Sequence, residues 1–265
     1  YRNNDANYPF RQFSDFHYLT EWPEPVAHAV ILVNDSVPEL HMFVLDKNEE
    51  METWDGKRIG KQGAVDLYGA KIAYSNTQYK SELINLLKGH TDIYCDYSSN
   101  SFQEIDQQVL NLAVPYDQRG GNFSKANLHS LQPILSELRL IKQEGELELL
   151  QKACDISIEG HLAAMKFTKP GAYEYQVAAE MEKTFYHLGA ERLGYNSIVA
   201  GGDNSCILHY STNREELEDG KLLLIDAAAE NQGYASDITR TFPVNGKYTK
   251  EQALIYDVVL NAQEK

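Results

Sequence analysis

The feature that most constrains this chain is a pair of β-capable segments, residues 222–230 and 234–242, that flank the sequence Asn231-Gln232-Gly233. Aliphatic and β-branched residues on both sides of a short polar connection ending in Gly predict a β-hairpin. The second half of the chain is therefore expected to contain an antiparallel strand pair.

The hairpin brings two carboxylates together. If its loop consists of Asn231 and Gln232, Asp226 lies directly opposite Asp237, and a bulge at Gly233 would shift this pairing by one residue. Directly opposed residues have Cβ atoms about 4.5–5.5 Å apart, so the two carboxylates are close enough to contact one cation.

Two like charges facing each other across a strand pair destabilise the pair unless something compensates them. A proton shared between Asp226 and Asp237 is one form of compensation, and one or two divalent metal ions are another. The third interpretation is a different register, with both residues as ordinary exposed strand residues. The hairpin alone disfavours the shared proton and leaves the other two interpretations open.

Composition narrows the class of protein. Hydrophobic residues make up 43% and charged residues 24% of the 265 residues, which is typical of a folded globular protein. The net charge of −15 argues against nucleic acid and anionic membranes as partners. The apolar runs are too short for a membrane helix, which needs about 20 residues. Three widely separated cysteines, Cys95, Cys154 and Cys206, predict a reducing compartment and a cytoplasmic protein.

The first part of the chain has the pattern of a mixed α/β domain. Strands are expected at residues 27–33, 40–45 and 71–74, and helices at residues 81–88 and 102–112. This alternation of strands and helices predicts a partly parallel sheet.

A change of composition toward Gln, Gly, Asn and Ser at residues 116–133 indicates a connection between domains. We place the boundary near Leu131, which gives one domain at residues 1–130 and a second at residues 131–265. Tyr1 opens the chain without a preceding Met or a visible signal peptide, so we expect that processing or truncation removed its start.

The second domain is expected to begin with two amphipathic helices, at residues 142–167 and 174–188, and another helix starts near Lys250. The apolar face of the first helix is predicted to comprise Leu147, Leu150, Cys154, Ile158, His161 and Met165, and that of the second Val177, Met181, Phe185 and Leu188. We interpret His161 as a core or boundary residue.

The hairpin sequences IDAAAE (225–230) and YASDITRTFPV (234–244) resemble the metal-binding hairpin of the pita-bread metallopeptidases. More narrowly, the chain resembles the Xaa-Pro aminopeptidases. Collinear similarity continues through the segments YPFRQFSDF (8–16), ELRLIK (137–142), YNSIV (195–199) and NSCILHY (204–210). Matches of this length and order are more specific than a single short motif.

The resemblance implies an α/β (α+β) fold, with a creatinase-like N-terminal α/β domain followed by the first part of a pita-bread catalytic domain. It implies hydrolysis of the peptide bond between an N-terminal residue and a following proline. The implied cofactors are two divalent metal ions, with Mn favoured. The implied partners are peptides with proline in the second position, and the implied assembly is a homo-oligomer, a dimer or a tetramer.

The resemblance also implies roles for three residues. Asp226 matches the first metal ligand, Asp237 matches the carboxylate that bridges both metals, and His209 matches a catalytic histidine that contacts the substrate. Without the resemblance, His209 would be interpreted as a core or loop histidine. The family's remaining His and Glu ligands and its general base are expected outside this chain, so we expect the chain to be truncated at both ends and inactive alone.

Two positions depart from the family's pattern. Ala228 stands where the family usually has Gly, and His17 stands where a bulky aromatic residue is common.

The alternative functions to an Xaa-Pro aminopeptidase are an Xaa-Pro dipeptidase and a metal-free pita-bread binding protein. Creatinase-like amidinohydrolases lack the metal pair, so the presence of both Asp226 and Asp237 argues against them.

Overall fold

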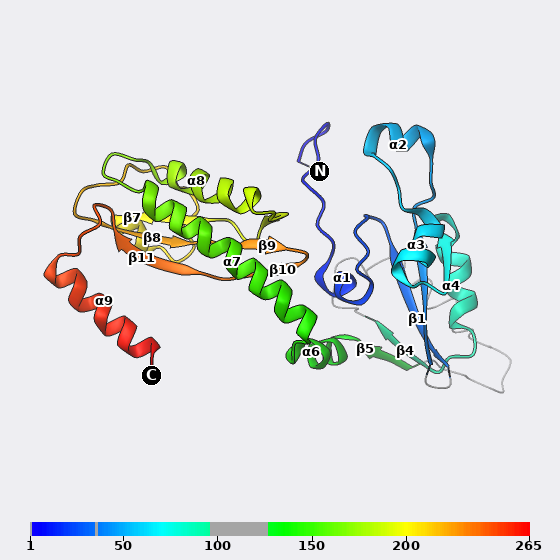
Figure 1. Ribbon diagram of the computed structural model, residues 1–265. Helices are drawn as coiled ribbons and strands as arrows, with labels where there is room; N and C mark the ends of the chain where they lie inside the picture. Colours follow the sequence, from blue (N-terminus) through cyan, green and yellow to red (C-terminus); the bar gives the residue numbers. More distant parts are fainter. Residues whose placement is uncertain (1, 35–36, 96–126) are drawn as a thin grey trace. The chain divides into compact units, whose positions relative to one another are not determined.

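The computed structural model describes residues 2–34, 37–95 and 127–265. The chain forms two compact units, unit 1 at Tyr1–Ile141 and unit 2 at Lys142–Lys265, which Figure 1 draws in blue to green and in green to red. The helix predicted at residues 102–112 lies outside the described residues.

Unit 1 is a mixed α/β structure, as the sequence predicts. Its elements are α1 (Ser14–Thr20), β1 (His28–Asn34), β2 (Val37–Val44), α2 (Glu49–Asp55), α3 (Gly60–Tyr68), β3 (Ile72–Ser75), η1 (Asn76–Gln78), α4 (Tyr79–Leu87), β4 (Asp92–Cys95), β5 (Asn127–Ser130) and α6 (Gln132–Leu140). Strand β2 pairs antiparallel with β1 and parallel with β3, and β4 pairs parallel with β5. The prediction of a partly parallel sheet is therefore confirmed.

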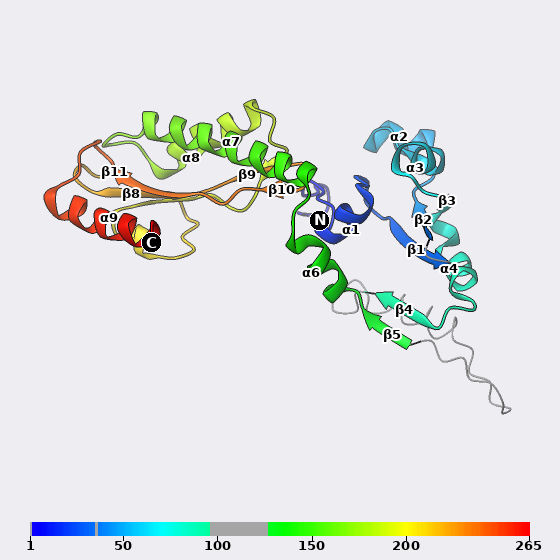
Figure 2. The ribbon, with the colours of Figure 1, turned by 60° about the horizontal axis from the view of Figure 1, so that its bottom comes forward.

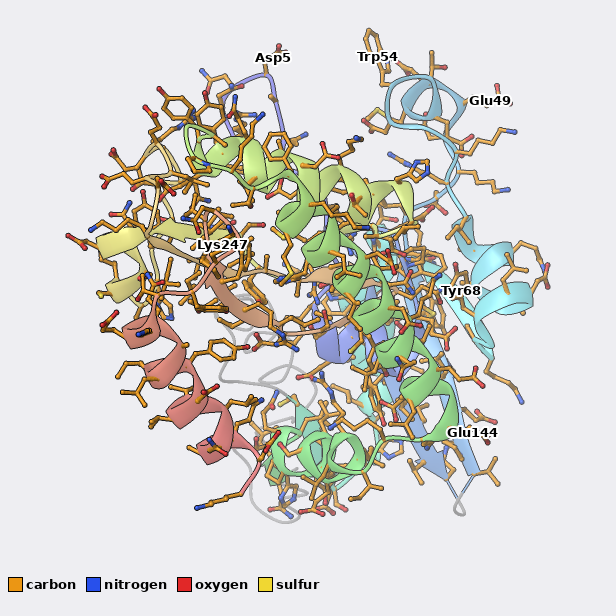
Figure 3. The ribbon with its side chains drawn as sticks, turned by 60° about the vertical axis from the view of Figure 1, so that its left-hand side comes forward. Asp5, Glu49, Trp54, Tyr68, Glu144 and Lys247 are labelled. Carbon is orange, nitrogen blue, oxygen red and sulfur yellow. The ribbon has the colours of Figure 1, made fainter. Side chains whose placement is uncertain are left out.

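The core of unit 1 lies between strand β2 and helix α3. Trp22, Met42, Val44 and Ala64 are fully buried there. In contrast to the buried Trp22, Trp54 has 81% of its surface exposed, and Figure 3 shows its ring pointing away from α2.

Helix α6 belongs to unit 1 through its contacts with α1. Asp15 on α1 forms an ion pair with Arg139 and accepts a hydrogen bond of 3.1 Å from Nε2 of Gln132. The Tyr18 hydroxyl donates to the carbonyl of Leu138 at 3.3 Å. The two compact units therefore meet between Ile141 and Lys142, which is one helix later along the chain than the boundary predicted near Leu131.

Unit 2 contains three α-helices and two three-stranded sheets, of order β11-β8-β7 and β10-β9-β6. Its elements are α7 (Glu144–Phe167), α8 (Glu174–His187), β6 (Arg192–Leu193), β7 (Ile198–Gly201), η3 (Gly202–Cys206), β8 (Leu222–Asp226), β9 (Ala229–Asn231), β10 (Tyr234–Ala235), β11 (Thr239–Pro243) and α9 (Lys250–Gln263). Figures 1 and 2 both show α7 and α8 on one side of the β8–β11 sheet and α9 on the other.

The buried face of helix α7 is rotated relative to the predicted face, of which His161 is buried and Leu150, Cys154 and Met165 are half-buried. Two members of the predicted face, Leu147 and Ile158, are 55% and 47% exposed. The residues that are buried are Ala153, Ile156, Ser157, Gly160, His161 and Ala164. The face with small residues is the buried one because α8 packs close to α7. A Cβ added at Gly160 would lie 2.1 Å from the ring of Phe185.

Most of the other predictions for these two helices are confirmed. His161 is buried, which confirms its interpretation as a core residue. On α8, Val177, Met181 and Phe185 are buried as predicted, whereas Leu188 is 38% exposed. In the part of the chain that the structure describes, no helix is long and apolar enough to cross a membrane.

Candidate metal centre

The predicted hairpin is present, but its turn lies one residue later along the chain than expected. Tyr234 of β10 pairs with Asn231 of β9, so the loop consists of Gln232 and Gly233. These two residues have φ angles of 49° and 79°. Two successive residues with positive φ form the turn whose twist suits a two-residue hairpin, and Asn231 is therefore free to extend the strand.

Because of this turn, the predicted register is wrong by two residues. Asp226 pairs with Thr239, not with Asp237. A shift of two residues keeps a side chain on the same face of the strand, because side chains alternate with a period of two. The two aspartates are therefore diagonal neighbours on one face of the hairpin instead of directly opposed residues.

The hydroxyl of Tyr195 links the two carboxylates. It lies 2.5 Å from Oδ1 of Asp226 and 3.0 Å from Oδ1 of Asp237. Burial raises the pKa of the Tyr195 phenol, and its hydrogen bonds to the two carboxylates raise it further. A protonated hydroxyl has one hydrogen to donate, so both carboxylates converge on a single donor.

Sequence reasoning missed Tyr195 as a site residue. The segment YNSIV (195–199) carried part of the family resemblance, but no spacing rule shows that its first side chain reaches a hairpin about 30 residues away. A search for polar residues at the end of a strand next to β8 would have found it, because β7 begins at Ile198 and pairs with β8.

The chemistry of the two carboxylates fits a hard divalent cation, which prefers oxygen ligands. Asp226 is half-buried and Asp237 is exposed, so the pair is open to solvent on one side. Among residues 2–34, 37–95 and 127–265, no cluster of three or more His, Cys, Asp or Glu side chains is arranged to hold a metal. The described residues thus offer two carboxylate ligands and one hydroxyl.

His209 lies in the segment between η3 and β8, where its side chain is exposed. Within the described residues the hydrogen bonds of Asp226 and Asp237 go to Tyr195, and none goes to His209. The structure therefore brings the two aspartates together through Tyr195 and leaves the contribution of His209 as a prediction.

The segment that carries His209 is anchored by a buried carboxylate. Glu174, at the start of α8, is fully buried and accepts four hydrogen bonds. Its Oε1 accepts from the Gly201 amide at 2.8 Å and from Asn204 at 3.0 Å, and its Oε2 accepts from the Tyr210 hydroxyl at 2.7 Å and the Glu215 amide at 3.0 Å. This carboxylate satisfies donors on both sides of His209 and fixes the path of the segment.

The position that departs from the family's Gly is tightly packed. Ala228 is fully buried, and its methyl group would be 3.6 Å from a Cβ added at Gly194. The Gly194 amide also donates to the Ala228 carbonyl at 2.8 Å. A separation of 3.6 Å is an ordinary van der Waals contact, so the extra methyl group at position 228 fits beside residue 194.

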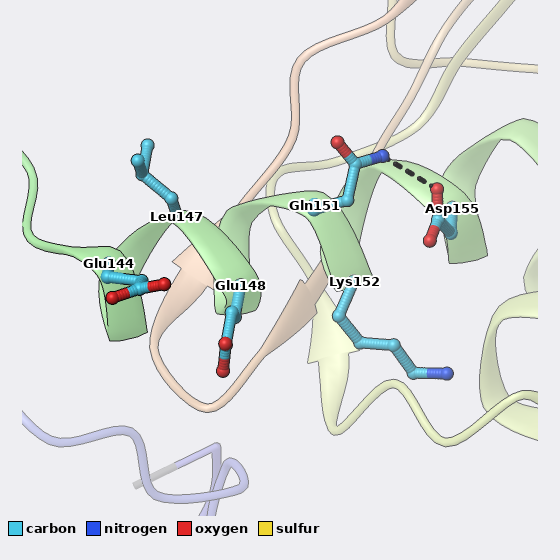
Figure 4. Close-up of a pocket in the computed structure, with 6 residues that line it drawn as sticks. All are labelled: Glu144, Leu147, Glu148, Gln151, Lys152 and Asp155. Carbon is cyan, nitrogen blue, oxygen red and sulfur yellow. Dashed lines mark hydrogen bonds between the residues drawn. The ribbon is translucent and has the colours of Figure 1, made fainter.

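A shallow depression on helix α7 contains none of the predicted site residues. Figure 4 shows that a single helix supplies its lining residues, Glu144, Leu147, Glu148, Gln151, Lys152 and Asp155. Polar residues on one face of one helix are typical of a solvated surface, so the functional site is assigned to the hairpin.

Two family models match the chain. Residues 148–265 match metallopeptidase family M24, and residues 1–94 match the N-terminal domain of aminopeptidase P. The chain belongs to metallopeptidase family M24. The second match covers most of unit 1, so both units resemble consecutive parts of the same kind of protein.

Relatives within family M24 agree with this assignment. The chain is 41% identical to the Xaa-Pro aminopeptidase of Haemophilus influenzae and 36% identical to that of Escherichia coli, and it is covered over 100% and 99% of its length. It matches proline aminopeptidase P II of Yersinia pestis with a TM-score of 0.92 at 38% identity, over 100% of this chain and 61% of the other. The chain spans 59% and 60% of the length of the two curated relatives.

Membership of family M24 confirms the predicted fold class, an N-terminal α/β domain followed by the first part of a pita-bread domain. It also implies divalent metal ions, since the family is one of metallopeptidases. A solved structure of zinc-substituted Escherichia coli aminopeptidase P in complex with product matches this chain at 36% identity with a TM-score of 0.92, covering 100% of this chain and 60% of that one.

Proposed function

We propose that the protein is a metal-dependent aminopeptidase that hydrolyses the bond between an N-terminal residue and a following proline. The observation that carries this proposal is the convergence of Asp226 and Asp237 on one hydroxyl, on the hairpin of a family M24 chain. The names of its relatives, Xaa-Pro aminopeptidases at 36–41% identity, support the choice of substrate.

Asp226 and Asp237 are proposed to hold divalent metal ions, two per site. Carboxylate oxygens suit hard divalent ions in general, and the resemblance to the Xaa-Pro aminopeptidases is what favours Mn among them. A divalent metal in such a site activates water and polarises the scissile carbonyl. The Tyr195 hydroxyl lies within hydrogen-bond distance of both carboxylates and, by donating to one of them at a time, would restrict their rotation. His209, which is exposed, is proposed to contact the substrate as the catalytic histidine.

The proposed substrate sets a particular recognition problem. An Xaa-Pro bond is a tertiary amide with no N–H group, so the enzyme has no amide donor to read at that position. Recognition then rests on the shape of the proline ring, the free N-terminal amine and the carbonyl oxygens. An exposed imidazole such as that of His209 can donate a hydrogen bond to one of these carbonyls.

The test uses the full-length protein. We expect close to two Mn²⁺ per chain by elemental analysis and cleavage of an Xaa-Pro-containing tripeptide but not of its Xaa-Ala analogue. Asp237→Ala is expected to lose at least one metal and nearly all activity. The control is Asp203→Ala, which removes an exposed carboxylate whose nearest cation, Lys221, is 3.8 Å away. Normal metal content and full activity in Asp237→Ala would overturn the assignment.

The same assay separates the alternatives. Cleavage of Xaa-Pro dipeptides with no cleavage of longer peptides would indicate a dipeptidase. A wild-type protein that binds no divalent metal would indicate a binding protein of the same fold.

We also propose a cytoplasmic homo-oligomer, a dimer or a tetramer. The location is supported by Cys95, Cys154 and Cys206, none of which forms a disulfide in the described part of the chain. The assembly is supported by large exposed apolar side chains in unit 1, among them Tyr8 and Trp54. Light scattering on the full-length protein measures the number of subunits.

A further inference from the structure

Two polar residues on the buried face of α7 contact the hairpin. Ser157 and His161 are 0% and 3% exposed and lie one helical turn apart, so both project from the same side of the helix. The rest of this buried face consists of Ala, Ile and Gly, which have no polar side-chain atoms. Burying polar groups on such a face costs free energy unless each finds a partner.

Their partners are the neighbours of the two aspartates. Nε2 of His161 donates to the carbonyl of Ala227, the residue after Asp226, at 2.9 Å. A carbonyl only accepts, so this bond fixes the tautomer with the proton on Nε2. The hydroxyl of Ser157 lies 2.7 Å from that of Ser236, the residue before Asp237.

Ser157 also reaches the other strand of the hairpin, because its Oγ accepts a hydrogen bond of 2.9 Å from the Ala229 amide. One serine therefore contacts both arms, and the histidine one turn later contacts the arm that carries Asp226. We call these two residues, Ser157 and His161, the α7 clamp.

The clamp lies where the hairpin's own ladder is weakest. Strand β8 ends at Asp226 and β9 begins at Ala229, while β10 ends at Ala235 and β11 begins at Thr239. Between these ends the arms are joined by the bond from the Ala227 amide to Ile238, at 3.2 Å, and by one from the Ser236 amide to Ala229, at 3.4 Å. Both are longer than the usual backbone distance of about 2.9–3.0 Å, so the ladder alone holds this stretch loosely.

We propose that Ser157 and His161 are positioning residues that set the separation of Asp226 and Asp237 and thereby the affinity of the metal site. This inference rests on the proposed function, since it assigns the clamp a role toward the metal. Ligand distances in metal sites are defined to about 0.2 Å, so a small shift of either arm changes affinity. Hydrogen-bonded supports of metal ligands are worth about 10–100-fold in affinity.

The experiment measures Mn²⁺ binding by calorimetry on the metal-free full-length protein, together with the midpoint of thermal unfolding. Ser157→Ala and His161→Leu remove the clamp's hydrogen bonds and keep most of its volume. Both are expected to bind Mn²⁺ at least about tenfold more weakly than the wild type. His161→Gln is expected to restore affinity to within about threefold, because its amide nitrogen can donate from nearly the position of Nε2.

The control is Ser75→Ala in unit 1. Ser75 is a buried serine that donates to Asp46, and it lies in the other unit from the hairpin. This variant is expected to lower the midpoint of thermal unfolding while binding Mn²⁺ as the wild type does. It shows how much of any effect comes from losing a buried hydroxyl as such.

The outcomes separate the two proposals. If the wild type binds Mn²⁺ and Ser157→Ala binds it equally well, the clamp only packs the core and the inference is overturned while the proposed function stands. If the wild type binds no Mn²⁺, the proposed function fails and the inference fails with it. Should His161→Leu not fold, Ser157→Ala and His161→Gln still decide the question.

Discussion

The Tyr195 hydroxyl lies 2.5 Å from Oδ1 of Asp226, close enough for a strong hydrogen bond to a charged acceptor. In the metal-free protein this bond gives the half-buried carboxylate a partner. The same hydroxyl also faces Asp237 at 3.0 Å, so it reduces the cost of holding two like charges on one hairpin face. Tyr195 thus occupies the position where compensation is needed when no cation is bound.

Tyr195→Phe is expected to destabilise the metal-free protein by about 1–3 kcal/mol, the usual cost of a lost hydrogen bond to a charged group. The stabilisation gained on adding Mn²⁺ is expected to grow, because the cation then relieves a larger repulsion. Urea unfolding with and without Mn²⁺ measures both effects. Tyr234→Phe is the matched control, since it removes a 2.8 Å bond to Glu146, which is not part of the site. Equal gains from Mn²⁺ in both variants would contradict this account of Tyr195.

The sequence predicts the hairpin that carries the site but not its register. Alternating strand residues around a polar loop locate both arms, and either loop leaves Asp226 and Asp237 on one face because the two registers differ by an even number of residues. The choice of loop depends on which residues adopt positive φ. Gln232 does so here, although Asn is the residue type more often found with positive φ, and the turn therefore lies one residue later.

Contacts between distant segments could not be predicted from local patterns. Helical periodicity placed Leu147 and Ile158 in the core of α7, yet the stripe that packs is the one around Gly160, because close approach of α8 favours small residues. Glu174 has the sequence context of an exposed residue in the first turn of a helix. It is fully buried because four donors from a later segment converge on it.

Glu174→Gln is expected to cost about 2–4 kcal/mol of stability, since the amide group of Gln offers donors where two N–H or O–H groups need an acceptor. Faster hydrogen exchange is expected at the amides of Gly201 and Glu215, which donate to this carboxylate. Glu182→Gln on the same helix is the control, because Glu182 accepts a hydrogen bond of 2.8 Å from the Ser197 hydroxyl. This substitution should cost about 1 kcal/mol or less. Similar losses in the two variants would argue against a special role for Glu174.

His41 gives unit 1 a pH-dependent stability. Burial lowers the pKa of His41 below its ordinary value of 6.5, Glu39 at 3.9 Å partly opposes this shift, and Lys71 adds to it. The unfolded chain therefore binds the proton at a higher pH than the folded chain. Stability is fully present above about pH 6.5 and is lost as the pH falls toward the lower folded pKa. The Tyr74 hydroxyl, 3.4 Å from Nδ1, is the other polar group at this ring.

His41→Gln is accordingly expected to lose less stability than the wild type between about pH 7.5 and pH 5.5, since it removes the titrating group. Tryptophan fluorescence during urea unfolding measures this, because both tryptophans of the chain, Trp22 and Trp54, lie in unit 1. Identical losses in the two proteins over this range would show that His41 does not cause the dependence.

Two glycines of helix α7 test how closely α7 and α8 approach. A methyl group at Gly160 would lie 2.1 Å from a ring carbon of Phe185, whereas one at Gly145 has no neighbour within 4 Å. Gly160→Ala is therefore expected to cost about 1–3 kcal/mol through overpacking. Gly145→Ala is expected to stabilise by about 0.5 kcal/mol, because Ala favours the helix and nothing is displaced. Circular dichroism during urea unfolding measures both changes in stability. The two variants carry the same substitution in the same helix, so they differ mainly in the contact with Phe185. If both substitutions changed the stability in the same direction, helix propensity and not this contact would decide the stability at position 160.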